Sequence, residues 1–346
     1  MRRHLNTLYV TTENAWLHKD GENAVVKAHG VELGRVPVHL LGSIVCIGSI
    51  GVTPSLVGHC AERGVRISMM GRNGRFLARI EGPVSGNVLL RRSQYRAADT
   101  AERTAAIAGH IVTGKLLNQR TVVRRALRDH GAHSPPEVSA RLRTCERRMS
   151  DAARRSAIPQ AIDVLRGIEG EAARAYYAVF NDLVRSYERT FAFCRRSRRP
   201  PLDPVNALLS FLYSLLVLDY RSALETVGLD PAVGFLHRER PGRPSLALDL
   251  MEEFRPVLAD RLALSLINRR QLAASDFETA VTGSVTMREE ARKKVLVAYQ
   301  NRKKDELVHP FLREKTTIGL VPFVQANLMA RHLRGDVDGY PPFLWR

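Results

Sequence analysis

Cysteine is scarce in this sequence, and its few copies form no recognisable metal or disulfide motif. The 346 residues contain four cysteines, and no two of them make a C-x-x-C pair: Cys46, Cys60, Cys145 and Cys194. This spacing argues against both a zinc ribbon and a disulfide framework. The N-terminus, MRRHLNTLYV, also lacks the roughly 7 to 15 residue apolar stretch that a secretory signal requires. We therefore expect reduced thiols, no export and a cytoplasmic protein.

Acidic residues are also in short supply relative to basic ones. The sequence has 35 Asp and Glu against 53 Lys and Arg, which gives a formal net charge of +18. Such a balance is typical of proteins that lie beside polyanions, nucleic acid above all. It argues against an acidic enzyme of small-molecule metabolism.

Only one uncharged segment is long enough to be considered as a membrane span. Residues 36–61 contain no Lys, Arg, Asp or Glu. Several glycines, two histidines and Pro54 interrupt this segment, and its pattern is that of a buried strand followed by a short helix. We therefore expect a soluble protein without membrane contact.

The first part of the chain has the pattern of a β domain. Short apolar runs such as SIVCI (43–47) alternate with turn signals, and the dipeptides Asp20-Gly21 and Asn73-Gly74 are typical of tight hairpins. Residues 54–63 precede a glycine, which predicts a short helix with a glycine at its end. We predict a small, mostly antiparallel β domain that ends at about residue 85.

Beyond Pro83 the composition changes to that of a helical protein. Apolar residues recur at helical spacing over residues 89–127, without any proline. The stretch 91–155 carries fifteen Arg and Lys against six Asp and Glu. This charge fits either a solvated helix face or a surface that follows a phosphate backbone, and both interpretations stay open.

One carboxylate falls on the predicted inward face of a helix. In VLRGIEGEAARAYYAVFNDLV (164–184), Glu169 lies within or beside an apolar stripe that includes Ile168 and Tyr176, whereas Glu171 faces water. A carboxylate on a buried face needs a partner. An arginine, a capping bond or a metal ion would each serve.

A histidine and two further carboxylates occur in the segment VGFLHRERPGRPSLALDLMEEFRP (233–256). Asp249 and Glu252 are three residues apart, which places them on one side of a helix, and the preceding loop can fold His237 over them. A lone histidine is usually structural. Together, Glu169, His237 and Glu252 make a mixed carboxylate and imidazole set that suits Mg²⁺ or Mn²⁺ and leaves open positions for phosphodiester chemistry.

Arginines are crowded ahead of a core helix. The segment FAFCRRSRRPPLDPVNALLSFLYSLLVLDY (191–220) places four of them in five positions before two prolines. Water or phosphate groups would relieve their repulsion, so a loop that grips a DNA backbone is one interpretation. Pairing with acids such as Asp182 or Asp203 is the other. The candidate DNA contacts are Arg195, Arg196, Arg198, Arg199, Arg238, Arg243, Lys293 and Lys294.

These segments together resemble the first core protein of CRISPR-Cas systems, the metal-dependent integrase and endonuclease of the spacer-acquisition module. The resemblance covers essentially the whole chain, because GIEGEAARAYY, RRPPLDPVNALLSFLYSLL and HRERPGRPSLALDLMEEFRP follow a β-rich part in the family's order. The form is most similar to the type I-C branch. In that family a Glu, a His and an Asp or Glu hold the metal, and these positions fall on Glu169, His237 and Glu252. Asp249 matches a further carboxylate near the ion, which implies a supporting catalytic role.

The resemblance also implies a fold, partners and a reaction. The expected fold class is α+β: a β-sandwich-like domain over residues 1–85 that forms a homodimer, a linker over 86–95, and a helical catalytic domain over 96–346. The implied partners are prespacer and repeat-array DNA and a dimer of the module's small ferredoxin-like second protein. The implied reaction is transesterification, with Mg²⁺ or Mn²⁺, by the 3′-hydroxyl of the prespacer. The alternative is a non-catalytic, basic DNA- or RNA-binding structural protein in which the carboxylates are packing partners.

Overall fold

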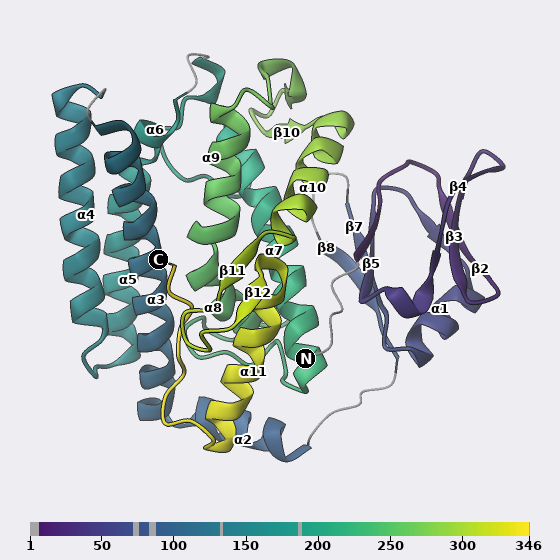
Figure 1. Cartoon of the computed structure of the whole chain (residues 1–346), viewed down its shortest axis with the longest axis horizontal. Coiled ribbons are helices and arrows are strands. Elements are labelled where there is room, and N and C mark those ends of the chain that lie inside the picture. Colours follow the sequence, from purple (N-terminus) through teal and green to yellow (C-terminus); the bar gives the residue numbers. More distant parts are fainter. Residues whose placement is uncertain (1–6, 72–75, 83–87, 132–133, 186–188, 346) are drawn as a thin grey trace. The chain divides into compact units, whose positions relative to one another are not determined.

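The protein divides into two compact units, one built on strands and one built mostly on helices (Figure 1). The computed structural model describes residues 7–71, 76–82, 88–131, 134–185 and 189–345. The first unit comprises residues 1–85 and 287–297, and the second comprises residues 86–286 and 298–346. The expected α+β class is confirmed. The sequence prediction placed residues 287–297 in the helical domain, whereas here they group with the strands.

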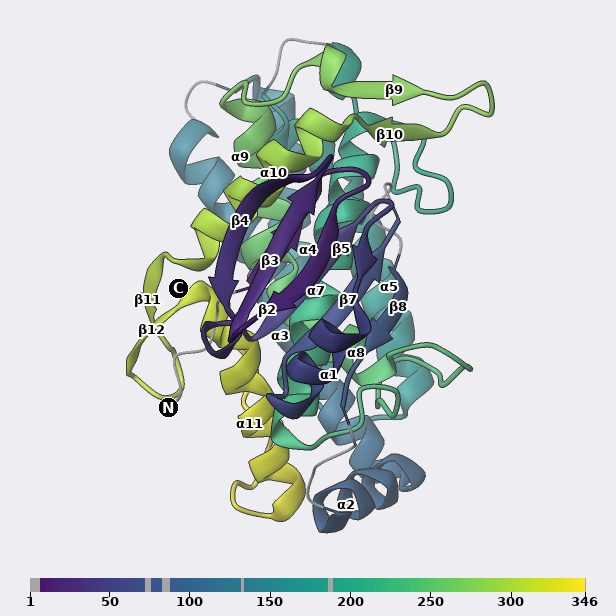
Figure 2. The same cartoon turned by 90° about the vertical axis from the view of Figure 1, so that its right-hand side faces the viewer.

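The first unit is a sandwich of two sheets, with strand orders β1-β5-β7-β8 and β4-β3-β2-β6. The two sheets face one another in Figure 1, and Figure 2 shows β4, β3 and β2 running side by side. Alternate side chains of both sheets, among them Leu17, Ile44 and Ile67, point inward and form one buried core. The strands are β1 Thr7–Val10, β2 Trp16–Asp20, β3 Asn23–Ala28, β4 Val31–Pro37, β5 Ser43–Ile47, β6 Gly51–Val52, β7 Arg66–Met70 and β8 Phe76–Ile80.

The strand pairing is less antiparallel than the sequence suggested. β5 pairs in parallel with both β1 and β7, and β2 pairs in parallel with β6. Parallel neighbours need a crossover connection, and the chain between β5 and β7 supplies one that contains the predicted helix, α1 (Pro54–Glu62). The Asp20-Gly21 hairpin is confirmed, because β2 and β3 pair antiparallel around Gly21, whose φ is 56°. The predicted hairpin at Asn73-Gly74 lies outside the described residues.

The helices follow one another through the rest of the chain, with short two-stranded pairs between them. The pairs are β9 (Phe277–Thr279) with β10 (Val285–Met287), and β11 (Glu306–Val308) with β12 (Lys315–Thr317). The helices are α2 Val88–Asp99, α3 Ala101–His130, α4 Pro136–Ser156, α5 Ile162–Ala178, α6 Phe180–Leu183, α7 Pro204–Val227, α8 Ser245–Phe254, α9 Arg261–Asn268, α10 Glu289–Lys303 and α11 Val321–Arg334.

The sequence prediction placed a linker over residues 86–95, and in the structure the residues from Val88 onward belong to helix α2. Gln94 on this helix is fully buried. Its side-chain amide donates to the carbonyls of Asp230 and Val233, both at 2.8 Å, and accepts the N–H of Asp230 at 2.9 Å. The region with apolar residues at helical spacing thus already begins in α2. Through Gln94, this helix anchors the loop that leads to His237.

Helices α3, α4 and α5 pack side by side, and α3 also packs on α8 (Figure 1). Helix α7 is the apolar core helix predicted from the sequence. It begins where Oδ1 of Asp203 accepts the N–H of Asn206 at 2.7 Å, as an N-cap does. Among the described residues, α7 is the helix long and apolar enough to cross a membrane, but 67% of that window is buried inside the protein.

Candidate active site

Two of the three predicted metal ligands meet at a buried lysine. Glu169 on α5 and Glu252 on α8 both pair with the ammonium of Lys115 on α3. Nζ of Lys115 lies 2.7 Å from Oε2 of Glu252 and contacts Oε1 of Glu169. The side chains of Lys115 and Glu252 are 6% and 7% exposed, and that of Glu169 is 26% exposed. The partner that a carboxylate on this helix face needs is therefore a lysine.

A second cation holds Glu252 from the other side. NH1 of Arg255, one turn further along, donates to Oε1 of Glu252 at 2.5 Å. Burial alone raises the pKa of Glu252, but the charges of Arg255 and Lys115 outweigh it and hold the pKa well below its usual range. Burial likewise lowers the pKa of Lys115, and the carboxylates of Glu252 and Glu169 reverse this effect and raise it. Glu252 is therefore a buried, ionised carboxylate between two cations, and Glu169 shares one of these cations with it.

His237 lies on the loop before α8 and is held in place by Asp249. Nδ1 of the imidazole is 2.6 Å from Oδ1 of Asp249, which also accepts the backbone N–H of His237 at 2.9 Å. Oδ2 of Asp249 accepts the backbone N–H groups of Phe235 and Leu236 at 2.6 and 2.9 Å. Because a carboxylate accepts, Nδ1 carries the proton, and Nε2 is left as the nitrogen that can bind an ion. Asp249 is therefore a positioning residue for the imidazole.

Gly234 allows this loop to lie against α8. A Cβ at position 234 would come within 2.7 Å of Oδ2 of Asp249 and 2.7 Å of the carbonyl carbon of Ser245. Side chains essentially never approach backbone this closely, so the contact requires glycine. Glycine therefore lets Asp249 reach the backbone ahead of His237.

The donor set suits a divalent cation. Among the described residues no three His, Cys, Asp or Glu side chains are already grouped as a metal site, and Lys115 sits between Glu169 and Glu252. Oε2 of Glu252 is buried and has no hydrogen-bond partner within the described part of the chain, although it pairs with the Lys115 charge. His237 is close enough for its charge to lower the pKa of Glu252 as well. Two carboxylates on one cation with an imidazole beside them fit Mg²⁺ or Mn²⁺.

Glu253, the neighbour of Glu252, makes different contacts and is not an alternative ligand. Its Oε1 accepts the hydroxyl of Tyr340 at 2.6 Å and the amide of Gln325 at 2.8 Å, and Oε2 accepts the N–H of Phe343 at 3.1 Å. Burial raises the pKa of Glu253 to about 8, against the effect of these bonds. The two adjacent glutamates thus have separate roles.

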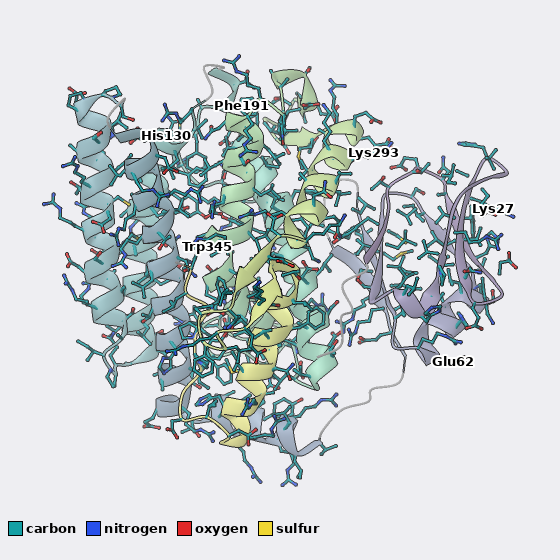
Figure 3. All side chains as sticks on the ribbon, in the orientation of Figure 1. Lys27, Glu62, His130, Phe191, Lys293 and Trp345 are labelled. Carbon is teal, nitrogen blue, oxygen red and sulfur yellow. The ribbon has the colours of Figure 1, made fainter. Side chains whose placement is uncertain are left out.

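The C-terminal segment around Phe343 and Trp345 connects α3 to α8 through hydrogen bonds. Asn118, one turn after Lys115, donates to the carbonyls of Glu253 and Phe343, both at 2.7 Å. Its side-chain oxygen accepts the N–H of Trp345 at 2.7 Å. Figure 3 places Trp345 beside α3. The helices that carry Lys115 and Glu252 are therefore joined through the end of the chain.

A buried polar network leads away from the site. NH2 of Arg255 donates to the hydroxyl of Tyr177 at 3.1 Å, and this hydroxyl lies 3.0 Å from that of Tyr213. The hydroxyls of Tyr213 and Tyr176 donate to the two oxygens of Asp260, at 2.5 and 3.0 Å. The guanidinium of Arg255 also lies 4.0 Å from the ring centroid of Tyr213. These contacts fix Arg255 firmly.

Arginines from two segments gather near the His237 loop. Arg195, Arg198, Arg199 and Arg238 are exposed, and Arg243 is half-buried. Burial lowers the pKa of Arg243, and the charges of Arg240, Arg198 and Arg199 add to this effect, which shows that the two segments lie close together. Guanidinium groups at such close quarters favour a bound anion.

Arg196, predicted to contact DNA, turns its guanidinium inward in the structure. NH1 donates to Oδ1 of Asn206 at 2.6 Å and to the carbonyl of Ser197 at 2.5 Å, and NH2 donates to the hydroxyl of Ser210 at 3.0 Å. Arg196 therefore stabilises the start of α7. The acids suggested as partners of this run are used elsewhere: Asp203 caps α7 and Asp182 pairs with Arg141 at 2.7 Å.

Lys293 and Lys294 lie on α10, in the part of that helix that groups with the β unit. Lys293, labelled in Figure 3, pairs with Glu289 and Glu290 of its own helix at 3.0 and 3.1 Å. The charge of Lys293 is thus partly neutralised within the helix. These two lysines belong to one unit of the protein, and the carboxylates of the site belong to the other.

Lys115 and Arg255 are the site residues that the sequence prediction missed. Lys115 shares the inward stripe of α3 with Asn118 and Gln119, and all three are buried. Polar residues at i, i+3 and i+4 within an apolar helix face indicate a buried polar site, and this signal was available. For Arg255, the signal was its position three residues after Glu252.

A family model, a curated relative and two solved structures are similar to this chain. The family model for CRISPR associated protein Cas1 matches residues 8–301. The chain is 58% identical over 347 residues to CRISPR-associated endonuclease Cas1 2 of Rhodospirillum rubrum, with 100% of both chains covered. A casposase bound to integration product aligns with a TM-score of 0.82 at 22% identity over 99% of this chain and 95% of that one. A Cas6-RT-Cas1–Cas2 complex aligns with a TM-score of 0.79 at 24% identity over 100% of this chain and 36% of that one.

Proposed function

Since the chain belongs to the Cas1 family of CRISPR-associated endonucleases, we propose that it inserts short DNA fragments into a CRISPR repeat array as a metal-dependent integrase. The observation that carries this proposal is the convergence of Glu169 and Glu252 on one buried cation, close to His237. Buried carboxylates of this kind are costly to maintain without a use for their charge. A non-catalytic DNA- or RNA-binding protein, the alternative function, would have no use for two negative charges at this position.

The residues that would hold the ion are Glu169, Glu252 and Nε2 of His237. When bound there, Mg²⁺ or Mn²⁺ polarises a phosphoryl oxygen and lowers the pKa of an attacking hydroxyl. Asp249 binds Nδ1 of His237 and so leaves Nε2 as the nitrogen available to the ion. Arg255 keeps Glu252 ionised and in position.

The reaction needs no covalent bond to the protein. The 3′-hydroxyl oxygen of the incoming DNA forms a bond to phosphorus in the repeat array and loses its proton to solvent. The bond to the leaving 3′-oxygen of the array strand breaks, and this oxygen takes up a proton from solvent to become a new 3′-hydroxyl. The arginines on and beside the His237 loop bind the phosphate backbone and orient it for this attack. We assign this role to Arg195, Arg198, Arg199, Arg238, Arg240 and Arg243.

We infer that the chain works on DNA together with the small second protein of its module. A structural neighbour is a complex with Cas2, and another is a casposase on its integration product. We also infer a homodimer formed through the β unit. Three large apolar side chains on β2 and β4 support this, because Trp16, Val31 and Leu33 are 59%, 62% and 52% exposed. The free cysteines suit the reducing cytoplasm.

A strand-transfer assay tests the proposal. The chain and its small partner are mixed with a labelled prespacer and a plasmid that carries the repeat array, with Mn²⁺ or with EDTA. We expect branched product only with the metal, and a loss of about 100-fold or more for Glu252→Gln. Glu253→Gln is the matched control, since it removes the adjacent carboxylate, and it should retain activity. Integration at near wild-type rate by Glu252→Gln under limiting Mn²⁺ would overturn the proposal.

A further inference from the structure

Lys115 is the cation on which the two carboxylates of the site converge. It projects from α3, whereas Glu169 and Glu252 come from α5 and α8, so the ammonium joins three helices. The contact to Glu252 is 2.7 Å, and the contact to Glu169 is also direct. Both carboxylates therefore point toward one another because a positive charge lies between them.

We propose that Lys115 is a positioning residue, a tethered counter-cation that holds Glu169 and Glu252 together in the metal-free protein and withdraws when a divalent ion binds. This inference rests on the proposed function, because it takes these two carboxylates as ligands of the ion. It adds that the site limits its own metal affinity, since each binding event has to break the contacts made by Lys115.

The charges of the metal-free site are balanced, and a divalent ion would upset this balance. In the metal-free site, Lys115 and Arg255 supply two positive charges for the two negative charges of Glu169 and Glu252. A divalent ion added to this set would raise the positive charge to four beside the two carboxylates. Repulsion between close cations is strong in a buried site, so one of the two resident cations has to leave the carboxylates.

The contacts of the two cations decide which one leaves. Arg255 is held by Tyr177 at 3.1 Å and lies over the ring of Tyr213, so it stays with Oε1 of Glu252. Within the described part of the chain, the Lys115 ammonium pairs with the two carboxylates alone. Its four-carbon stem is also flexible, whereas the guanidinium fork of Arg255 is rigid. Lys115 is therefore the mobile member of the pair.

Manganese binding to the full-length chain tests the inference, with free Mn²⁺ followed by its electron paramagnetic resonance signal. Lys115→Met removes the charge and keeps much of the side-chain volume. We expect the Mn²⁺ dissociation constant to fall about tenfold, the scale on which residues around metal ligands act. A purely structural role would weaken Mn²⁺ binding or leave it unchanged, and either result overturns the inference.

Lys303→Met is the matched control. The side chain of Lys303 is 4% exposed, and its ammonium pairs with both oxygens of Asp219 at 2.8 and 3.0 Å. Its removal also deletes a buried lysine from an ion pair, but at a position that shares no contact with Glu169 or Glu252. We expect lower thermal stability and an unchanged Mn²⁺ affinity. Tighter Mn²⁺ binding by both variants would overturn the specific role of Lys115.

Refolding in Mn²⁺ covers the case in which Lys115→Met does not fold alone. The ion replaces the missing charge, so Mn²⁺ should rescue folding of the variant, and failure of this rescue counts against the inference.

Glu169→Gln in the same Mn²⁺ titration separates the inference from the proposed function. Equal Mn²⁺ binding by Glu169→Gln and wild type overturns the metal site itself. Weaker binding by Glu169→Gln with no tightening by Lys115→Met overturns only the role of Lys115.

Discussion

Asp249 holds His237 twice through one oxygen, because Oδ1 accepts the backbone N–H at 2.9 Å and lies 2.6 Å from Nδ1 of the ring. The carboxylate thereby fixes both the position of the residue and the tautomer of its imidazole. Asp249 is fully buried, so water does not compete for these bonds. The chemical role of His237 depends on a residue that need not touch the ion.

Asp249→Asn should weaken Mn²⁺ binding about 10- to 100-fold, the usual effect of losing a residue that orients a metal-binding histidine. An amide has one accepting oxygen, so the variant cannot serve both the ring and the N–H groups of Phe235 and Leu236. Asp203→Asn is the control, because it changes another carboxylate that accepts a backbone N–H, at the start of α7. Isothermal titration should show unchanged Mn²⁺ affinity for the control. Equal affinity for both variants would contradict the positioning role.

Gly234→Ala should impair strand transfer and lower the free energy of unfolding by about 1–3 kcal/mol, as overpacking does. The added Cβ would lie 2.7 Å from both Asp249 and the backbone of Ser245, so the loop has to move and take His237 with it. Gly167→Ala is the comparison, because nothing lies within 4 Å of its Cβ position and it lies inside helix α5. The free energy of unfolding of Gly167→Ala should rise by up to about 1 kcal/mol. Urea unfolding and the integration assay measure both effects, and equal behaviour of the two variants would refute the packing argument.

The arginine run should separate into residues that bind DNA and one structural member. Replacing Arg195, Arg198 and Arg199 together by Gln should leave the melting temperature within a few degrees, since all three are exposed. The same variant should bind DNA more weakly, and the slope of log K against log salt should flatten by up to about 0.9 for each phosphate that the variant no longer binds.

Arg196→Gln is the contrasting variant. It deletes the bonds of NH1 and NH2 to Asn206 and Ser210, so it should lower the melting temperature more than the triple variant does. Its DNA affinity should change less. A triple variant that unfolds early but binds DNA normally would show that these arginines are structural too.

Glu253 should make the protein less stable as pH rises from about 5 to 8. Burial raises its pKa from 4.5 to about 8, so over this interval the folded protein keeps a proton that the unfolded chain has released. Rising pH therefore favours unfolding, by at most about 1.4 kcal/mol per pH unit. Glu253→Gln cannot titrate and should lose less stability over the same interval. Urea unfolding at several pH values measures the difference, and parallel curves for the two proteins would contradict it.

The meeting of Glu169 and Glu252 could be anticipated in part from the sequence, because each of them belongs to a local pattern. Glu169 falls on an apolar helix face, and Asp249 and Glu252 share one side of a helix after a loop that contains a histidine. These patterns depend on residues a few positions apart, which is the range over which sequence periodicity carries information.

The cations of the site and the strand directions depend on contacts between distant segments. Lys115 reaches Glu169 across 54 positions, and no periodicity links the two. The parallel pairing of β5 with β1 and β7 likewise depends on which strands meet, and apolar runs alone do not encode that. The charge of Arg196 is visible in the sequence, whereas its bond to Asn206 depends on the fold.

Anomalous X-ray scattering from crystals of the protein soaked in Mn²⁺ locates the ion without reference to activity. We expect one strong peak in contact with a carboxylate oxygen of Glu169, a carboxylate oxygen of Glu252 and Nε2 of His237, with the ammonium of Lys115 withdrawn from both carboxylates. A peak held by other residues, or full occupancy of the carboxylates by Lys115 at saturating Mn²⁺, would contradict it.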